Sequence, residues 1–269
     1  MSDGVTPGAA EKAAALLSVQ QLGVRFGGVA ALQDISFTVE AGESVAVIGS
    51  NGSGKTTLFN LLSGRIRPTE GRADFAGHEI TRKASDRIAR MGVARTFQEV
   101  RIYRRFTVLE NMLFALRQRR GETVAAALFP FGGARRRAPM IQTAEMWLEC
   151  VGLADRRDAL AGQLSYGRGK LLEIVRALCT QPRLVLLDEP AAGLSPAGLQ
   201  DLYGLLKGER CAGITVLFVE HNLNAVEQLA DRVLALHAGR LIAVGTPGDI
   251  QQNALVRAAY AGNQEQRSC

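Results

Sequence analysis

Near its start the chain alternates apolar and polar residues, the pattern of β-strands with one buried face. Leu17–Phe26 alternates with one slip at Gln20 and Gln21, which favours a half-buried strand that could carry a bulge there. Ile35–Val39 alternates without interruption and predicts a second strand. Ser44–Ile48 is almost wholly apolar, as expected for a parallel strand that is covered on both faces.

Strand and helix patterns also alternate in the last third of the chain. Leu184–Leu187 and Ile214–Val219 are two further apolar runs that predict buried strands. The helical patterns around them are Gly169–Cys179, Pro196–Lys207 and Leu223–Leu229. This alternation predicts an α/β fold with a parallel central sheet.

The middle of the chain, Thr107–Ala177, shows helical patterns and no strong strand. The helices expected there are Thr107–Arg119, Ile141–Val151 and Lys170–Leu178. Between the first two lies Gly121–Met140, which we interpret as a mobile loop or a small hairpin of helices. A helical subdomain is therefore expected between two halves of a sheet-containing core.

Composition narrows the class of protein without naming a function. With 47% hydrophobic and 22% charged residues, the 269-residue chain is not disordered, collagen-like or a coiled coil. No segment approaches the roughly 20 apolar residues that span a bilayer, so work at a membrane would need another chain for the span. The net charge of +6 permits anionic partners but selects none. Reduced thiols in a cytosolic protein are expected from the widely spaced Cys150, Cys179, Cys211 and Cys269.

A glycine-rich turn follows the apolar run Ser44–Ile48 and opens a predicted helix at Thr56–Leu62. Its residues fit the phosphate-binding pattern G-x-x-x-x-G-K-[ST], in the strand-to-helix context that the pattern requires. The glycines let backbone N–H groups point inward, where they and the positive end of the helix cradle phosphate oxygens. Lys55 adds charge at the β- and γ-phosphates, and the Thr56 hydroxyl reaches Mg²⁺. The predicted nucleotide-binding residues are Gly49, Ser50, Asn51, Gly52, Ser53, Gly54, Lys55, Thr56 and Thr57.

The apolar run Leu184–Leu187 ends on a pair of carboxylates. The strand delivers Asp188 to the edge of the sheet, where it can hold Mg²⁺ through water. Glu189 follows directly and can polarise an attacking water as a general base. Alone, such a pair is usually a solvated turn, but the phosphate loop upstream favours the catalytic interpretation.

Leu164–Gly167 lies just before a helical pattern, and with it the chain resembles the nucleotide-binding subunit of ATP-binding-cassette (ABC) transporters from about Leu17 to Gly262. The family signature begins L-S-G-G-Q or a close variant, whereas this chain has Arg168 at the fifth position. The resemblance implies that Ser165 and the N–H groups from Gly167 onward donate to the γ-phosphate of ATP on the opposite subunit.

Further positions acquire roles through this resemblance. Gln98 matches the Q-loop, which links the γ-phosphate and Mg²⁺ to the helical subdomain. His221 matches the switch histidine that contacts the γ-phosphate. Phe26 matches an aromatic residue that stacks on adenine, with a core phenylalanine as the alternative. Ala192–Pro196 occupies the D-loop place but departs from the commoner S-x-L-D form. The implied Mg²⁺ residues are Thr56, Gln98 and Asp188.

The implied fold is the ABC ATPase fold: a P-loop NTPase core with a parallel central sheet, an N-terminal antiparallel β region and an inserted helical subdomain. One nucleotide-binding domain would span residues 17–262. Its core would comprise residues 17–97 and 179–262, and its helical subdomain, with the signature, residues 98–178. Residues 1–16 are expected to form a flexible tail and residues 263–269 a C-terminal tail.

Within the family, four segments look like the ATPases of bacterial uptake systems for branched-chain and other hydrophobic amino acids: Ala94–Gln98, Thr107–Asn111, Asp188–Leu194 and Gly245–Gly262. The resemblance implies ATP and Mg²⁺ as cofactors and a second ATPase subunit, identical or homologous, in a head-to-tail dimer. It also implies integral-membrane permeases and, indirectly, a periplasmic binding protein. The chain would be peripheral, at the cytoplasmic face of the inner or plasma membrane.

Three other functions stay open at this point. One is an ABC exporter ATPase of the lipopolysaccharide type, whose motifs are similar. Another is a soluble ABC ATPase acting on nucleic acid, which is disfavoured because the chain has one cassette and no sustained heptads. The third is a regulatory subunit without useful turnover, which the departure at Arg168 keeps open.

Overall fold

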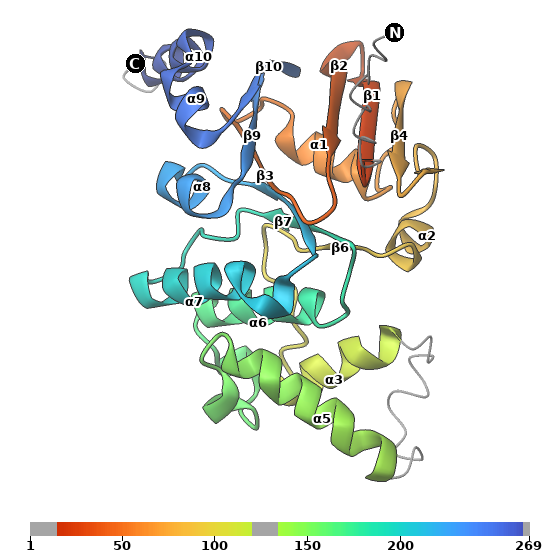
Figure 1. Ribbon diagram of the computed structural model, residues 1–269, viewed down its shortest axis with the longest axis vertical. Coiled ribbons are helices and arrows are strands. Elements are labelled where there is room, and N and C mark those ends of the chain that lie inside the picture. The colour runs from red at the N-terminus through yellow and green to blue at the C-terminus, as the bar shows by residue number, and fades with distance from the viewer. Residues whose placement is uncertain (1–14, 120–133, 266–269) are drawn as a thin grey trace, which may run out of the picture.

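The computed structural model describes residues 15–119 and 134–265, which form two sheets and the helices around them (Figure 1). Sheet A is antiparallel, in the order β2-β1-β4-β5: β1 (Leu17–Phe26), β2 (Val29–Val39), β4 (Glu70–Phe75) and β5 (His78–Glu79). Sheet B has the order β10-β9-β3-β8-β7-β6: β3 (Ser44–Gly49), β6 (Val93–Arg95), β7 (Leu184–Asp188), β8 (Thr215–Val219), β9 (Arg232–His237) and β10 (Arg240–Gly245). Within sheet B only β10 runs antiparallel to its neighbour.

Helices cover both sheets and build a separate end of the molecule. In Figure 1 sheet A lies at the upper right, sheet B crosses the middle, and α3 and α5 form the lower end. The helices are α1 (Lys55–Leu62), α2 (Ser85–Arg90), α3 (Val108–Arg119), α5 (Ala134–Glu149), α6 (Tyr166–Leu178), α7 (Pro196–Lys207), α8 (Leu223–Leu229), α9 (Pro247–Gln252) and α10 (Ala254–Glu265). None of the helices in the described part of the chain is long and apolar enough to cross a membrane.

The slip in the first strand is a bulge, as the pattern allowed. The register between β1 and β2 shifts between Val19 and Leu22, and Gln21 has a φ of 49°. Its N–H donates to the Ser36 hydroxyl at 2.8 Å, which replaces a lost ladder hydrogen bond. Leu16, which the sequence placed in the tail, is buried and accepts a hydrogen bond from the Ala76 N–H.

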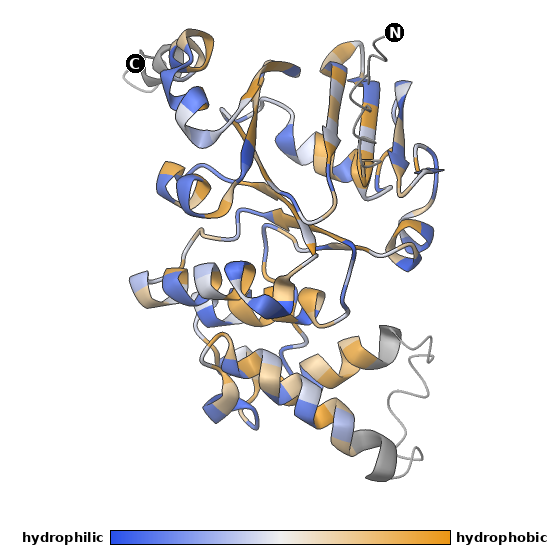
Figure 2. Ribbon diagram, in the orientation of Figure 1, coloured by the Kyte–Doolittle hydropathy of each residue, from blue (hydrophilic) through white to orange (hydrophobic). Residues whose placement is uncertain are grey.

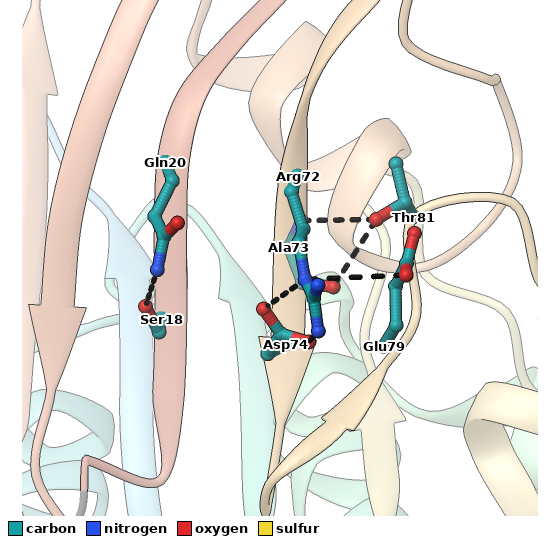
Figure 3. A network of polar contacts seen from close by, with 7 residues as sticks. All are labelled: Ser18, Gln20, Arg72, Ala73, Asp74, Glu79 and Thr81. Atoms are coloured by element: carbon teal, nitrogen blue, oxygen red, sulfur yellow. Dashed lines mark hydrogen bonds and ion pairs between the residues drawn. The ribbon is translucent and has the colours of Figure 1, made fainter.

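One face of sheet A carries a network of polar side chains that we interpret as a surface feature and not as a functional site. Figure 3 shows its side chains, where the Arg72 guanidinium donates twice to the Asp74 carboxylate at 2.6 Å. Glu79 lies 3.9 Å from Arg72, and Gln20 donates to the Ser18 hydroxyl at 3.3 Å. The network lies on a solvated face of the sheet, where ion pairs contribute little stability.

Successive residues of the central strands point to opposite faces of sheet B, and other elements cover both faces. Ile48 and Leu187 lie in one apolar cluster with residues of α3, α5, α6, α7 and α8. Val45 and Val47 lie in a second cluster with residues of sheet A and α1. Burial on both sides explains why these strands are continuously apolar in sequence, as Figure 2 also shows for sheet B.

The helical end agrees with the predicted insertion, and its main differences from the prediction are the starts of α5 and α6. α6 begins at Tyr166 rather than Gly169, because the Ser165 hydroxyl accepts the N–H of Arg168 and caps the helix one turn earlier. α5 begins at Ala134, so the last part of the segment interpreted as a mobile loop or a small hairpin of helices is helical up to Met140. The rest of that segment, residues 121–133, lies outside the described residues.

Candidate functional site

Four strands of sheet B end at one edge of the sheet. Val219 at the end of β8 pairs with Val47 of β3 on one side and with Asp188 of β7 on the other. The phosphate-loop residues follow β3, Glu189 follows β7, His221 follows β8, and the segment that leads to Gln98 follows β6. In parallel α/β sheets this carboxyl edge is where ligands bind. Sheet B therefore gathers most of the predicted site residues although they are far apart in sequence.

Lys55 lies inside the phosphate loop. Its ammonium donates to the carbonyl oxygens of Gly49 at 2.9 Å and Ser50 at 2.8 Å, and the residue is 6% exposed. Burial lowers the pKa of Lys55, while the nearby carboxylates of Glu189 and Asp188 act in the opposite direction. An ammonium held inside a glycine-rich loop at the start of a helix is suited to bind phosphate oxygens.

Two glycines of this loop occupy positions that no other residue fits. A Cβ on Gly49 would lie 2.2 Å from the carbonyl oxygen of Leu236 on the adjacent strand. A Cβ on Gly54, whose φ is +105°, would lie 2.5 Å from the Leu32 side chain.

Among the described residues the buried Ser53 hydroxyl has no hydrogen-bond partner. The other predicted loop residues, Ser50, Asn51, Gly52, Thr56 and Thr57, are half-buried or exposed and are accessible to a ligand.

The two carboxylates at the end of β7 have different surroundings. Asp188 is 4% exposed, and its Oδ2 lies 3.6 Å from Nη2 of Arg95. Burial raises the pKa of Asp188, and the Arg95 charge opposes that rise. Glu189 is more open, and its Oε1 lies 3.2 Å from Nε2 of His221. The predicted general base and the predicted switch histidine are therefore in contact.

The donor set fits a Mg²⁺ ion that is held jointly with a nucleotide. Mg²⁺ in phosphate sites uses one or two protein oxygens and completes its octahedron with phosphate oxygens and waters. Asp188 offers one buried carboxylate, and the exposed Thr56 hydroxyl stands on the first turn of α1. Within residues 15–119 and 134–265, no group of three or more His, Cys, Asp or Glu side chains could hold a metal by itself.

The signature segment borders a cavity that has no phosphate-loop residue in its lining. The cavity, of about 400 Å³, is lined by Ser165, Gly167 and other residues of the first two turns of α6, by Val151, and by the D-loop and the first turns of α7. The Arg168 guanidinium donates to the Gly152 carbonyl at 3.3 Å, so its side chain is bound within the chain. Gln98 is exposed, and its backbone carbonyl accepts a hydrogen bond from the Tyr166 hydroxyl at 3.3 Å. This bond joins the Q-loop segment to α6, the helix that follows the signature.

Phe26 ends β1 and is 51% exposed. A core phenylalanine would be buried, so that alternative is wrong for this residue. An exposed ring at the end of a strand is available for stacking on a ligand.

Sequence reasoning left three buried charged residues at this edge without a role: Arg95, Lys170 and Glu220. Lys170 and Glu220 are each 2% exposed, and the Arg95 side chain is 8% exposed. The available signal was a charge inside an otherwise apolar pattern, because a buried charge needs specific partners. Lys170 interrupts the apolar face of α6, and Glu220 extends the apolar strand β8.

Comparison with known proteins places the chain in a family. A family model described as "ABC transporter" matches residues 32–192. The high-affinity branched-chain amino acid transport ATP-binding protein BraF of Pseudomonas aeruginosa is 40% identical over 249 residues, which cover 92% of this chain and 98% of that protein. The corresponding protein LivG of Escherichia coli K12 is 39% identical with the same coverage.

Solved structures agree with these sequence relatives. A nucleotide-free ATP-binding cassette from an ABC transporter matches with a TM-score of 0.78 and 32% identity, covering 91% of this chain and 98% of that chain. The ADP conformation of MJ1267, an ATP-binding cassette of an ABC transporter, matches with a TM-score of 0.77 and 32% identity, covering 92% of this chain and 99% of that chain. The expected ABC ATPase fold is confirmed. With the family matched over most of its length and a phosphate loop at the edge of its central sheet, the chain is an ATP-binding protein of the ABC transporter family.

Proposed function

We propose that this chain is the ATP-hydrolysing subunit that powers a membrane importer of branched-chain or other hydrophobic amino acids. The amino-acid class is supported by the relatives, which are named as ATP-binding proteins of branched-chain amino acid transport. Hydrolysis is supported above all by one observation, the 3.2 Å contact between Glu189 and His221 at the edge that carries the phosphate loop.

In this proposal the chain binds ATP with its phosphates at residues 49–57 and its adenine on Phe26. Thr56, Gln98 and Asp188 would hold Mg²⁺, which when bound neutralises charge on the phosphates. Glu189 accepts a proton from the attacking water, and His221 donates a hydrogen bond to the γ-phosphate. Lys55 and the loop N–H groups stabilise the negative charge of the transition state.

We also propose a head-to-tail dimer with a second ABC ATPase subunit, identical or homologous. The support is that the signature cavity, lined by Ser165 and Gly167, has no residue of the chain's own phosphate loop in its lining. Residues 98–178 would then act as the helical subdomain of a domain spanning residues 17–262. Permeases would hold the dimer at the cytoplasmic face of the membrane, and a periplasmic binding protein would deliver substrate to them.

The test of hydrolysis is Glu189→Gln in the complex assembled with its permeases. Loss of a general base lowers the rate about 10²–10⁴-fold, while ATP binding should persist because the phosphate loop is unchanged. Glu209→Gln is the matched control, since Glu209 is exposed on the turn after α7. Near-normal hydrolysis by Glu189→Gln would refute the role of Glu189.

The test of the transported class is uptake into vesicles that contain the complex, with the binding protein outside and ATP inside. Labelled leucine, isoleucine and valine should accumulate in the wild type and not with Glu189→Gln. Release of a preloaded lipid-linked substrate, without amino-acid uptake, would instead favour the exporter alternative.

A further inference from the structure

The turn that carries Glu189 has an unusual backbone. Glu189 has a φ of 49°, in the left-handed region that residues with a side chain rarely adopt. Its N–H donates to the Val219 carbonyl at 3.0 Å, and its carbonyl accepts the Ala192 N–H at 3.1 Å. Backbones of this kind persist only where surrounding groups hold them. The side chains that hold this turn are therefore candidates for a role in positioning Glu189.

Glu220 joins this turn to the segment that carries His221. One carboxylate oxygen, Oε1, accepts the N–H of Ala191 at 2.7 Å. The other, Oε2, accepts the N–H of His221 at 3.1 Å and of Asn222 at 3.3 Å. A single buried carboxylate thus binds two segments that lie 29 residues apart in sequence. Burial raises the pKa of Glu220, and the three N–H donors oppose that rise because they stabilise the charged form.

Lys170 holds the same turn from the signature helix. Its ammonium donates to the carbonyl of Glu189 and to that of Ala192, the latter at 3.3 Å. The ammonium also lies 5.8 Å from the centre of the Tyr166 ring. Burial lowers the pKa of Lys170, and the negative charge of Glu220 is the largest influence that opposes this shift. The two residues therefore support each other's charged forms around the turn.

The side chains of Glu189 and His221 need this support because they are partly open to solvent. Their exposed fractions are 22% and 38%, so packing alone does not hold them. Their 3.2 Å contact depends on the two backbone segments that Glu220 ties together. Catalytic groups act efficiently when their geometry is set before the substrate arrives.

We propose that Glu220 and Lys170 are positioning residues, which hold the Glu189 turn and the His221 segment in contact before nucleotide binds. The inference rests on the proposed function, because it takes Glu189 as the general base. The hydrogen bonds of both residues in this region go to backbone groups of the turn and of the His221 segment. Each residue therefore acts through the backbone that carries Glu189 or His221.

The first test is Glu220→Gln in the complex with its permeases. An amide has one accepting oxygen and one donating NH₂ group, so in either orientation it presents a donor to N–H donors. The turnover number should fall about 10²-fold, as for a misplaced catalytic group, while KM for ATP stays within twofold. Glu227→Gln is the matched control, since Glu227 is exposed on α8 only seven residues further on, and it should leave both constants unchanged.

Lys170 provides a second, independent pair of variants. Lys170→Met removes both donors and should lower the turnover number, whereas Lys170→Arg keeps donors for the two carbonyls and should retain most of it. If Glu220→Gln fails to fold, this pair still tests the proposal. Equal turnover for Lys170→Met and the wild type would overturn the role of Lys170.

Two further measurements separate positioning from general loss of structure. In nucleotide-free protein, hydrogen exchange at the Ala191 and His221 amides should accelerate in Glu220→Gln, while exchange in sheet A stays unchanged. Adding Glu220→Gln to Glu189→Gln should cause a further loss well below the loss that Glu220→Gln causes alone, because one of the two groups that Glu220 positions is already absent. Full additivity of the two losses, or unchanged turnover for Glu220→Gln alone, would overturn the inference. Normal hydrolysis by Glu189→Gln would instead refute the proposed function itself.

Discussion

Replacing Arg95 with methionine should destabilise the nucleotide-free protein, because this arginine joins α1 to the end of β7. Its Nη1 donates to the Asn60 side-chain oxygen at 2.9 Å and to the Ser63 hydroxyl at 2.7 Å. Its Nη2 lies 3.6 Å from Asp188, with exposed fractions of 8% and 6% for the two side chains. Methionine keeps an apolar stem of similar length and removes the charge.

The size of the loss follows from the charge that remains buried. Removing one partner of a buried ion pair costs about 3–5 kcal/mol, because the other charge stays in place without compensation. We expect the lower end, about 3 kcal/mol, because the Lys170 charge also stabilises ionised Asp188. Losing the Arg95 Nε, a buried donor with no partner among the described residues, offsets part of the cost. In a protein of this size, 3 kcal/mol corresponds to a fall in Tm of about 6–12 °C.

The assay is thermal unfolding without nucleotide or Mg²⁺, at neutral and at acidic pH. Burial raises the pKa of Asp188 and Arg95 lowers it, so the variant has the higher folded pKa. When a carboxyl group has a higher pKa in the folded than in the unfolded protein, the folded state loses stability as the pH rises from the unfolded-state pKa to the folded-state pKa. The Tm difference from the wild type should therefore shrink when the pH falls and Asp188 takes up a proton.

Arg90→Met is the matched control for this measurement. Arg90 also pairs with an aspartate, Asp86 at 3.2 Å, but the two side chains are 80% and 60% exposed. Such a pair contributes little, so the control should keep the wild-type Tm. Equal Tm values for Arg95→Met and Arg90→Met, or a difference that grows toward acid pH, would refute this account of Arg95.

Three further outcomes are expected. ATP hydrolysis per subunit should rise with protein concentration, because in the proposed head-to-tail dimer the partner supplies the signature segment to the γ-phosphate; a constant rate in a strictly monomeric preparation would contradict this. Arg168→Gln should leave the salt dependence of ATP-driven dimer closure unchanged, since the guanidinium is bound to the Gly152 carbonyl; a shallower dependence would show that it faces the partner's phosphates. Burial raises the pKa of the Cys211 thiol to about 12, whereas Cys150 is only partly buried. Iodoacetamide at pH 8 should therefore modify Cys150 before Cys211 in the folded protein, which peptide mass mapping can check. Equal rates of modification would contradict the burial of Cys211.

Features that depend on residues adjacent in the chain could be predicted from the sequence alone. α7 begins and ends where its pattern predicts, because Ser195 caps it and Pro196 fits its first turn. The phosphate loop could be predicted because its glycines, lysine and helix start follow one another along the chain. The bulge at Gln21 was visible as a slip in alternation. By contrast, β6 has three residues and β5 has two, which is too short for any periodicity to reveal.

The arrangement of the candidate site at the edge of sheet B was decided by the tertiary structure. Parallel pairing of β3, β8 and β7 brings Lys55, Asp188 and His221 together, and no local pattern encodes the order of strands in a sheet. The proposed roles of Lys170 and Glu220 are still harder to predict from the sequence. A buried charge in a sequence shows only that a partner must exist, and their partners here are backbone groups of a turn on another strand, whose conformation exists only once the sheet has formed.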